Sequence, residues 1–465
     1  MYRNVELAQL DLPEFGLPTV EPTLPAEVYR ARLARFVERG RAEGYDVLVV
    51  YGDREHFANI AYLTGYDPRF EEALLVIDLK NYGTKEPLLL VGNEGMGYIN
   101  VSPIKGDFEI ILYQNFSLLA QPRGQSRPLD EILRAGGVKA GSKVGAAGWK
   151  YYTESVNWLE IPGYLVDSLR ELAGGAENVR NVGHILMNAS SGLRAINEVE
   201  QLAAFEFAST FTSQSVRNAV FGVRPGMTEL EAGELMRLNG YPQATSMFLA
   251  SGARAALGMV SPSMNRIAVG DRFTACIGLW GALTSRAGFV VENASQLPAG
   301  VQDYVEKLVV PYYQAVVAWY ERVGIGVPGG ELYDLIHGRI GDAFFGVGLN
   351  PGHQIHLDEW MNSPIYKGST ELLQSGMALQ VDVIPATGTP YFTTNIEDGI
   401  ALADDALRAA FAEKYPEAWG RIQARRVFMQ NVLGITLKPE VLPFSNIPAY
   451  LPPYVLSPKQ AMRAL

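Results

Sequence analysis

The chain has 465 residues, of which 48% are hydrophobic and 19% are charged, and its formal net charge at pH 7 is −11. This composition is typical of a globular protein, and the length exceeds what one ordinary hydrophobic core covers, so we expect two domains. The acidic balance and the lack of a Lys/Arg run argue against a general binder of nucleic-acid backbones and against attraction to an anionic membrane surface.

Cysteine content and the N-terminal segment bear on the cellular compartment. The single cysteine, Cys276, excludes an intramolecular disulfide and is typical of a reducing compartment. The first residues are acidic and lack a continuous apolar stretch, so we expect no signal peptide. No run of about 18 apolar residues occurs, so no membrane span is expected. The sequence predicts a cytoplasmic protein.

The first part of the chain alternates between helix-like and strand-like segments. A proline-rich extended arm is expected at residues 1–25, followed by a helical pattern over about 27–45. Short apolar runs bounded by turn residues indicate buried strands. They lie at residues 46–52, 72–79, 87–93, 108–114 and 142–148, with a helix-like segment at 57–63 after the first. Strands alternating with helices predict an α/β domain over residues 26–180.

The second part has a different pattern. A long helical segment at residues 197–223 precedes Thr228 and Glu231, which have the spacing of a capping box for the next helix. Strand-like apolar runs and one further helix follow. The runs lie at residues 273–280, 377–385 and 398–403, and the helix at 301–323. We expect an α+β domain over residues 185–405, then a C-terminal helix and tail at residues 406–465.

Candidate chemistry concentrates in the second domain. The segment GHQIH at residues 352–356 holds His353 and His356 and is followed by two acidic residues. Asp382 interrupts an apolar run, and Glu397 opens another. A carboxylate in a buried strand costs several kcal/mol unless it is paired, protonated or metal-bound. His353, Asp382 and Glu397 are therefore candidate ligands of one site. The alternative is that Asp382 pairs with an arginine or caps a turn.

Several motifs occur in the order typical of one known superfamily. They are NIAYLTGY (residues 59–66), LRAINEVEQL (193–202), RPGMTELE (224–231), FLASGARAA (248–256), VGDRF (269–273), GHQIH (352–356), SGMALQVDVIP (375–385) and NIEDGIAL (395–402). Together they resemble the creatinase/aminopeptidase P superfamily, peptidase family M24. The resemblance implies an α/β creatinase-like N-terminal domain, an α+β pita-bread C-terminal domain, hydrolysis of C–N bonds in small substrates, and a homodimer.

Metal-dependent members of that superfamily hold two metal ions on two Asp, one His and two Glu. Here the first Asp position carries Cys276, and the second carries Ala287. The histidine position matches His353, the first Glu position carries Asp382, and the last matches Glu397. The resemblance therefore implies an incomplete dimetal site.

The proton-handling positions of the superfamily also differ. Arg254 and Met259 stand where Asn and His are usual, and Trp360 stands where a second catalytic His is usual. Neither Met nor Trp transfers a proton at physiological pH. The remaining groups leave two catalytic readings open, one with a metal ion and one without.

In the first reading, His353, Asp382 and Glu397 bind one divalent metal, zinc or manganese, with Cys276 as a fourth ligand. In the second, creatinase-like reading no metal binds, and His353 or His356 acts as the acid/base, while Asp382 and Glu397 orient it or bind a cationic group of the substrate. A structural alternative for Cys276 is a small buried hydrophobic residue.

Four further residues are candidate substrate contacts. In the superfamily, a turn of the N-terminal domain reaches a partner subunit's pocket, which implies roles for Arg69, Glu71 and Glu72; the alternative is a solvated charged loop. Trp360 is a candidate pocket residue. The sequence thus predicts a hydrolase of peptide, amide or amidino C–N bonds in small molecules or short peptides. The alternative is a non-catalytic protein that binds a small ligand in the same pocket.

Overall fold

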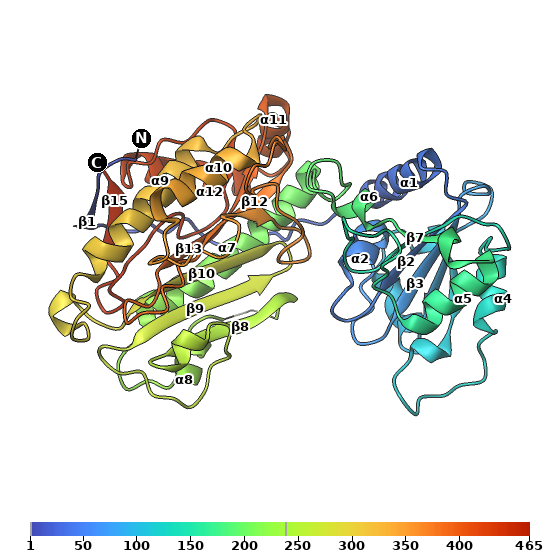
Figure 1. Ribbon diagram of the computed structural model, residues 1–465, viewed down its shortest axis with the longest axis horizontal. Helices are drawn as coiled ribbons and strands as arrows, with labels where there is room; N and C mark the ends of the chain where they lie inside the picture. The colour runs from blue at the N-terminus through green and yellow to red at the C-terminus, as the bar shows by residue number, and fades with distance from the viewer. Residues whose placement is uncertain (1, 238–239) are drawn as a thin grey trace. The chain divides into compact units, whose positions relative to one another are not determined.

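The structure is a computed structural model that describes residues 2–237 and 240–465 (Figure 1). The chain forms two compact units. One consists of residues 24–195, and the other of residues 2–23 together with 196–465. No helix in the described part of the chain is both long and apolar enough to cross a membrane.

The unit of residues 24–195 is built on a mixed sheet with the strand order β5-β4-β3-β2-β6-β7. The β2–β3 and β3–β4 pairs are antiparallel, and the β4–β5, β2–β6 and β6–β7 pairs are parallel. The strands are β2 (Val47–Gly52), β3 (Ala73–Asp78), β4 (Leu88–Val91), β5 (Glu109–Leu112), β6 (Val144–Ala147) and β7 (Val179–Asn181). The helices are α1 (Ala26–Ala42), α2 (Ala58–Thr64), α3 (Gly95–Tyr98), α4 (Leu129–Ala135), α5 (Gly163–Ala173) and α6 (Gly183–Met187).

Helices cover both faces of this sheet, which explains why its strands are apolar throughout. Val47 and Val49 share a core with the buried residues of α4 and α5. Leu48 points to the other face, toward α1, where a Cβ on Gly40 would lie 2.6 Å from Leu48 Cδ1. The five predicted strands and the α/β character of this part are confirmed.

The second unit contains an antiparallel sheet with the order β11-β12-β13-β10-β9-β8, to which β14 adds by pairing with β13. The strands of this sheet are β8 (Gln243–Ser251), β9 (Arg272–Leu279), β10 (Ala282–Phe289), β11 (His353–Gln354), β12 (Ala378–Val383), β13 (Asn395–Leu402) and β14 (Val441–Pro443). A separate two-stranded sheet consists of β1 (Val5–Gln9) and β15 (Gln460–Ala464). The helices of this unit are α7 (Val199–Gly222), α8 (Glu229–Glu234), α9 (Val310–Arg322), α10 (Gly329–Ile340), α11 (Asp405–Lys414) and α12 (Pro416–Asn431).

The long helix α7 packs along β9 and β10, and α9 packs against β12. The predicted capping box is present, because the Thr228 side chain accepts from the Glu231 backbone N–H and the Glu231 carboxylate accepts from the Thr228 backbone N–H. Strand β10 was not predicted, since Arg286 interrupts its apolar pattern. The structure buries Arg286 beside Asp398 at 2.7 Å, so a tertiary partner neutralises the charge within the sheet.

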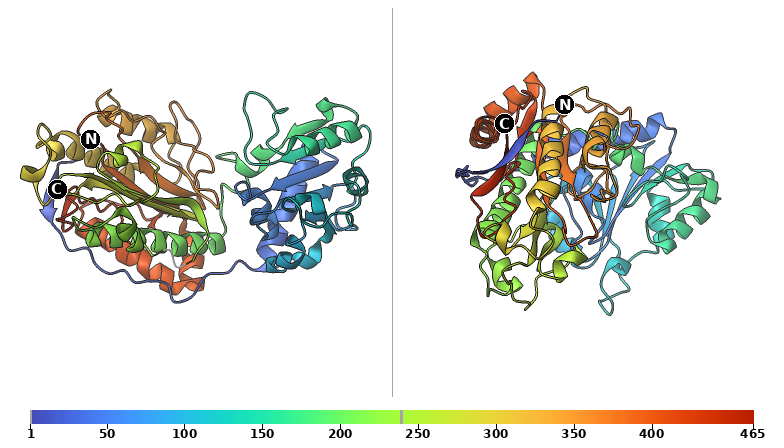
Figure 2. Two further views of the ribbon diagram at one scale, coloured as in Figure 1. Left: turned by 90° about the horizontal axis from the view of Figure 1, so that it is seen from below. Right: turned by 60° about the vertical axis from the view of Figure 1, so that its left-hand side comes forward.

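Both ends of the chain are integrated into the second unit. Strand β1, within the segment expected to be an arm, pairs antiparallel with β15, and the two termini lie side by side (Figures 1 and 2). Residues 406–465, expected to form one helix and a tail, form the helices α11 and α12 and the strands β14 and β15. The alternating segment Gln460–Ala464 gains its partner only when the distant N-terminus lies next to it.

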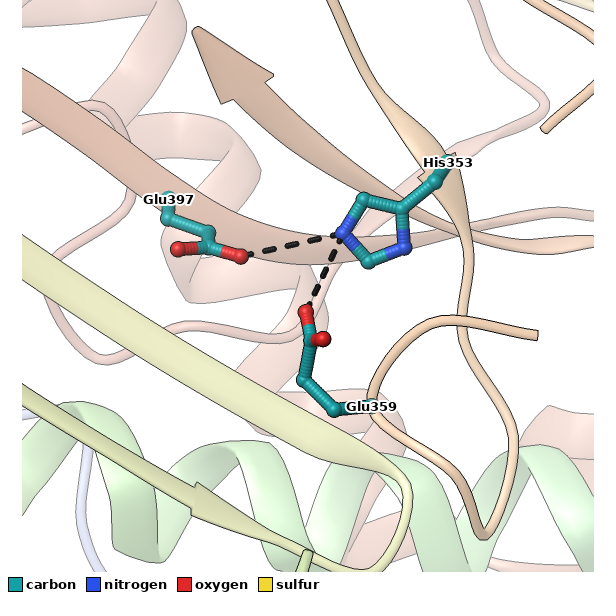
Figure 3. A group of neighbouring side chains, drawn as sticks. All are labelled: His353, Glu359 and Glu397. Carbon is teal, nitrogen blue, oxygen red and sulfur yellow. Dashed lines mark ion pairs between the residues drawn. The ribbon is translucent and has the colours of Figure 1, made fainter. Parts of the chain in front are cut away.

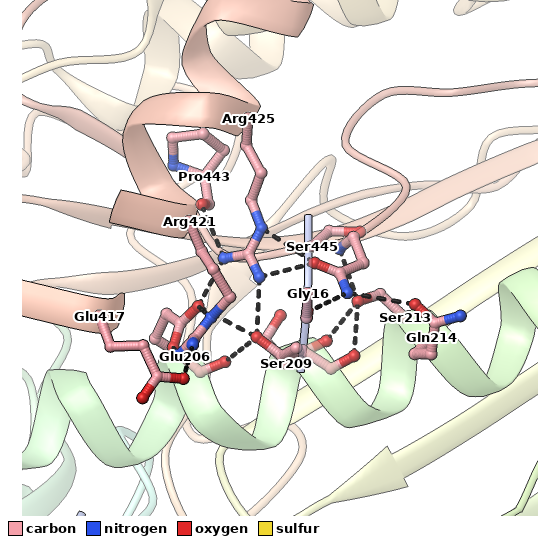
Figure 4. A network of polar contacts seen from close by, with 12 residues as sticks. Gly16, Glu206, Ser209, Ser213, Gln214, Glu417, Arg421, Arg425, Pro443 and Ser445 are labelled. Carbon is pink, nitrogen blue, oxygen red and sulfur yellow. Dashed lines mark hydrogen bonds and ion pairs between the residues drawn. The ribbon is translucent and has the colours of Figure 1, made fainter. Parts of the chain in front are cut away.

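A buried ion network fixes α12 against α7 (Figure 4). Glu206 on α7 accepts from Arg421 at 2.6 Å and from Arg425 at 2.7 Å. Arg425 also donates to Thr210 and to Asn446. Because Glu206 and Arg425 are fully buried, the loss of either partner would leave an uncompensated charge, which typically costs about 3–5 kcal/mol.

Candidate metal centre

The candidate site is built from a row of side chains that crosses the sheet of the second unit. Ser285 on β10 lies opposite Cys276 on β9 and opposite Glu397 on β13, and Glu397 lies opposite Asp382 on β12. Directly opposed residues of antiparallel strands share one face. The pairing register alone therefore gathers Cys276, Ser285, Glu397 and Asp382 on that face, although Cys276 and Glu397 are 121 residues apart in the sequence.

His353 enters this face from β11 at the edge of the sheet. It pairs with Gln380, two residues before Asp382, and so lies diagonally across from Asp382. Its Nδ1 lies 3.1 Å from the carbonyl oxygen of Gln354. Since a carbonyl only accepts, Nδ1 carries a hydrogen, and Nε2 is the ring atom turned to the carboxylates. The structure thus brings His353, Asp382 and Glu397 together as the sequence suggested.

Three carboxylates surround Nε2 of His353. The nearest oxygen of Glu359 is 3.3 Å away, that of Glu397 is 3.7 Å away, and that of Asp382 is 3.9 Å away. Figure 3 shows the first two converging on the ring. Ligand atoms of His353, Glu359 and Glu397 all lie within 4.8 Å of one another, the spacing of a metal-binding group. Glu359 comes from the loop after β11, and its proximity in sequence to His353 was the only signal for it.

Burial and mutual repulsion dominate the electrostatics of this cluster. Burial raises the pKa of Asp382 to about 6, against the attraction of His353. Burial and the Asp382 charge raise the pKa of Glu397 well above its ordinary value. Burial alone would lower the pKa of His353, but its ion pairs with Glu359 and Glu397 and the charges of Glu359 and Asp382 outweigh burial and raise that pKa to about 10. The cluster therefore attracts positive charge, either as protons or as a cation.

The residues fit one divalent cation better than two. His353 Nε2 and Asp382 Oδ1 are buried without a hydrogen-bond partner, as ligand atoms awaiting a cation would be. In the described part of β9 and β10, the strands that carry the two predicted Asp positions, no carboxylate points to the row. Ala287 lies in the next row, between Thr274 and Asn395. Ser285, rather than Ala287, directly faces Cys276 and Glu397.

Cys276 lines the same pocket but is not part of the group of mutually close ligand atoms among the described residues. Burial and the charges of Glu397 and Glu359 raise the pKa of its thiol well above the ordinary value, while Ser285 opposes them by a hydrogen bond. A thiol with a raised pKa is a poor ligand and a poor nucleophile until it loses its proton. Among the described residues, Glu359 and not Cys276 belongs with His353 and Glu397 to the group of close ligand atoms.

A pocket of about 740 Å³ opens onto the cluster. Asp382, Glu359, Glu397 and Trp360 line one part of it. Trp360 stacks on the His353 ring, with centroids 4.1 Å apart and planes at 18°. A volume of this size accommodates a short peptide or a comparable small molecule.

His356 lies away from the pocket lining. Its ring meets the edge of Phe205 on α7, and its Nδ1 accepts from the backbone N–H of Leu357 at 2.8 Å. The carboxylate cluster forms around His353 alone. A role for His356 as an acid/base stays a prediction.

The proposed substrate contacts of the other unit make local interactions. Glu71 is buried and accepts from the backbone N–H of Gly95 at 2.9 Å. Glu72 accepts from the hydroxyl of Tyr51 at 2.8 Å. Arg69, which has a φ of 60°, forms an ion pair with Asp67. These contacts show what holds the loop in its conformation, and a role in substrate binding stays a prediction.

No protein-family model matches the chain, and neither does the sequence of any curated protein. Solved structures do match. The chain shares its fold with solved structures of prolidase, Xaa-Pro dipeptidase and aminopeptidase P, so the predicted fold class, an α/β unit followed by an α+β unit, is confirmed.

The solved structures that are similar to this chain have low sequence identity to it. Prolidase from Pyrococcus horikoshii OT3 is 18% identical with a TM-score of 0.61, covering 80% of this chain and 95% of its own. Xaa-Pro dipeptidase from Bacillus anthracis is 16% identical with a TM-score of 0.60, covering 81% and 96%. A putative aminopeptidase P from Bacillus anthracis is 14% identical with a TM-score of 0.59, covering 86% and 99%.

Proposed function

We propose that the protein hydrolyses C–N bonds in short peptides or small amides with one divalent cation, zinc or manganese, bound to His353, Glu359 and Glu397. The observation that carries this proposal is the convergence of three carboxylates on one imidazole nitrogen in a pocket. Structures of the same fold bear the names prolidase, Xaa-Pro dipeptidase and aminopeptidase P, which supports peptides as the substrate class.

The chain's own residues supply the acid/base chemistry. Asp382 has an unpartnered Oδ1 and a pKa of about 6, so near neutral pH it accepts a proton from an attacking water and returns it to the leaving nitrogen. Asn395, whose Oδ1 is also buried without a hydrogen-bond partner, accepts an N–H of the substrate. When bound, the cation offsets the negative charge that develops on the carbonyl oxygen during attack.

Trp360 holds the ligand ring in place. It stacks in parallel on His353 and therefore restricts rotation of the imidazole about its Cβ–Cγ bond. In this proposal Trp360 is a positioning residue, in a place where the superfamily's resemblance implies a second histidine. Proton transfer consequently passes to Asp382.

The decisive experiment measures metal content and hydrolysis together. We expect about one zinc or manganese per wild-type chain, lost in His353→Ala and reduced in Glu359→Gln, with hydrolysis of Xaa-Pro peptides lost in parallel. His184→Ala is the matched control, because that histidine is half-exposed and pairs with Glu43 outside the cluster. Its metal content should equal that of the wild type.

The other outcomes identify the other hypotheses. Hydrolysis without metal would favour the creatinase-like mechanism. Absence of both metal and hydrolysis, with tight binding of a small ligand, would favour the binding protein. The homodimer and the cytoplasmic location belong to the same proposal, and sedimentation analysis and cell fractionation test them.

A further inference from the structure

Arg272 is the single cation among the described residues that line the pocket, and it lies at some distance from the carboxylate cluster. It is the first residue of β9, on the same face as Thr274 and Cys276, and all three line the pocket. Every second residue of a strand points to the same face, so this line of side chains runs from Cys276 toward Arg272. The pocket thus has an acidic part and a basic part.

The surroundings of Arg272 leave its charge uncompensated. Among the residues that the structure describes, it forms no ion pair and its side chain donates no hydrogen bond. Its guanidinium lies 5.6 Å from the ring centroid of Phe392, a cation–π arrangement. The side chain is only half-buried, so a ligand that enters the pocket can reach it.

The contact with Phe392 involves an unusual backbone conformation. Phe392 has a φ of 65°, in the left-handed region that a bulky side chain rarely adopts. Thr387 stabilises this turn, because its hydroxyl donates to the Phe392 carbonyl oxygen at 2.7 Å. Backbone strain of this kind persists where the surroundings enforce it, and it often accompanies a binding site. Here its effect is to bring an aromatic face to Arg272.

The strand positions of Arg272 and Glu397 set the length of a ligand that reaches both the basic part and the acidic part of the pocket. Cys276 lies four positions after Arg272 on β9, which corresponds to about 13 Å between their Cα atoms at a rise of about 3.3 Å per residue. Glu397 lies two strands from Cys276, about 10 Å further across the sheet. The two offsets combine to about 16 Å between the Cα atoms of Arg272 and Glu397. The Arg272 side chain, which lines the pocket, covers part of this distance, and an extended chain of about three to four residues covers the rest, whereas a dipeptide is too short.

From these observations we propose that Arg272 binds the terminal carboxylate of an extended peptide of about three to four residues, whose scissile bond lies at the His353 cluster. This inference rests on the proposed function and adds the substrate class, short anionic peptides longer than a dipeptide. Arg272 is a specificity-determining residue in this proposal. Phe392 holds the plane of the guanidinium so that it meets the carboxylate.

Peptide pairs that differ only in the terminal charge test this proposal. Calorimetric titration compares Gly-Pro-Ala-Ala carrying a free carboxylate with the same peptide amidated, and Gly-Pro in both forms, on protein kept in EDTA. We expect the free tetrapeptide to bind about 10- to 100-fold more tightly than its amide, the worth of a charged hydrogen bond. The dipeptide pair should show little difference.

The variants assign the preference to one residue. Arg272→Gln should abolish the preference for the free carboxylate, and Arg272→Lys should retain part of it. Arg266→Gln is the control for the change in net charge, because Arg266 is exposed and donates to the Gly226 carbonyl oxygen outside the pocket. Thermal melting checks that each variant is folded.

The two levels of the proposal fail differently. Hydrolysis of all peptides with no carboxylate preference, or a preference that survives in Arg272→Gln, would overturn the role of Arg272 and leave the hydrolase standing. A preference lost in Arg272→Gln, together with no hydrolysis of any peptide by metal-loaded protein without EDTA, would support the subsite and overturn the hydrolase. A wild type that binds none of the peptides at millimolar concentration would overturn the subsite.

Discussion

Replacement of Asp382 by Asn separates the cost of a buried charge from its use as part of a cation site. In the metal-free protein, burial raises the pKa of Asp382 from its ordinary 3.8 to about 6. The unfolded chain ionises this carboxyl at lower pH than the folded protein does. Stability is therefore lost as the pH rises from about 4 to about 6, and the loss persists above that range.

The size of the effect follows from the same pKa. A difference from 3.8 to about 6 corresponds to about 3 kcal/mol at high pH, because each pH unit is worth about 1.4 kcal/mol. The pKa of about 6 already includes the attraction between Asp382 and His353, so this figure is a net cost. Asn carries no proton to lose, so Asp382→Asn escapes that net cost. We expect the variant to be about 1–3 kcal/mol more stable than the wild type at pH 8 in EDTA, and about equally stable at pH 4.

Urea-induced unfolding at both pH values, with and without saturating zinc or manganese, measures these differences. With the cation bound, the order should reverse, since the Asp382 charge then contributes to cation binding. Asp167→Asn is the control, because Asp167 is exposed on α5 and should give no change in either condition. A metal-free Asp382→Asn protein that is less stable than the wild type at pH 8 would refute the reasoning, because Asp382 would then have a stabilising partner.

Two further predictions concern the proton on His353 and the ion network of α7 and α12. His353, with a pKa of about 10, must lose its proton before Nε2 binds a cation, so affinity for the cation should rise about tenfold per pH unit between pH 6 and pH 9 for each proton displaced. Calorimetry in buffers of different ionisation enthalpy counts those protons, and an affinity that does not vary with pH contradicts the assignment of His353 as a ligand. Glu206→Gln should lower the free energy of unfolding by about 3–5 kcal/mol, because Arg425 is left buried beside a neutral group. The control is Glu200→Gln on the same helix, which removes a half-exposed ion pair with Lys414 and should lower the free energy of unfolding by about 1 kcal/mol or less. Equal unfolding midpoints for these two variants in urea would show that the buried network adds nothing.

Much of the first unit could be predicted from local sequence. Its strands are short apolar runs, and their length and the turn residues that bound them indicated buried strands. The capping box of Thr228 and Glu231 was equally local, because both partners lie within one helical turn. The order of the motifs also sufficed to place His353, Asp382 and Glu397 in one fold.

The metal centre itself depended on contacts that the local pattern does not contain. Glutamate in a loop is usually exposed to solvent. Only the path of the loop after β11 brings a carboxylate oxygen of Glu359 to 3.3 Å from Nε2 of His353. The pairing register made Ser285, and not Ala287, the neighbour of Cys276 and Glu397, because a two-residue difference moves a side chain by one row.

The sequence by itself determined the class of fold and the identity of one histidine and two acidic residues that meet. The tertiary structure decided which further groups join them, since only the path of a loop and the register between distant strands set those distances. It also decided the position of the chain ends, because β1 and β15 each have an unsatisfied backbone edge until the other pairs with it.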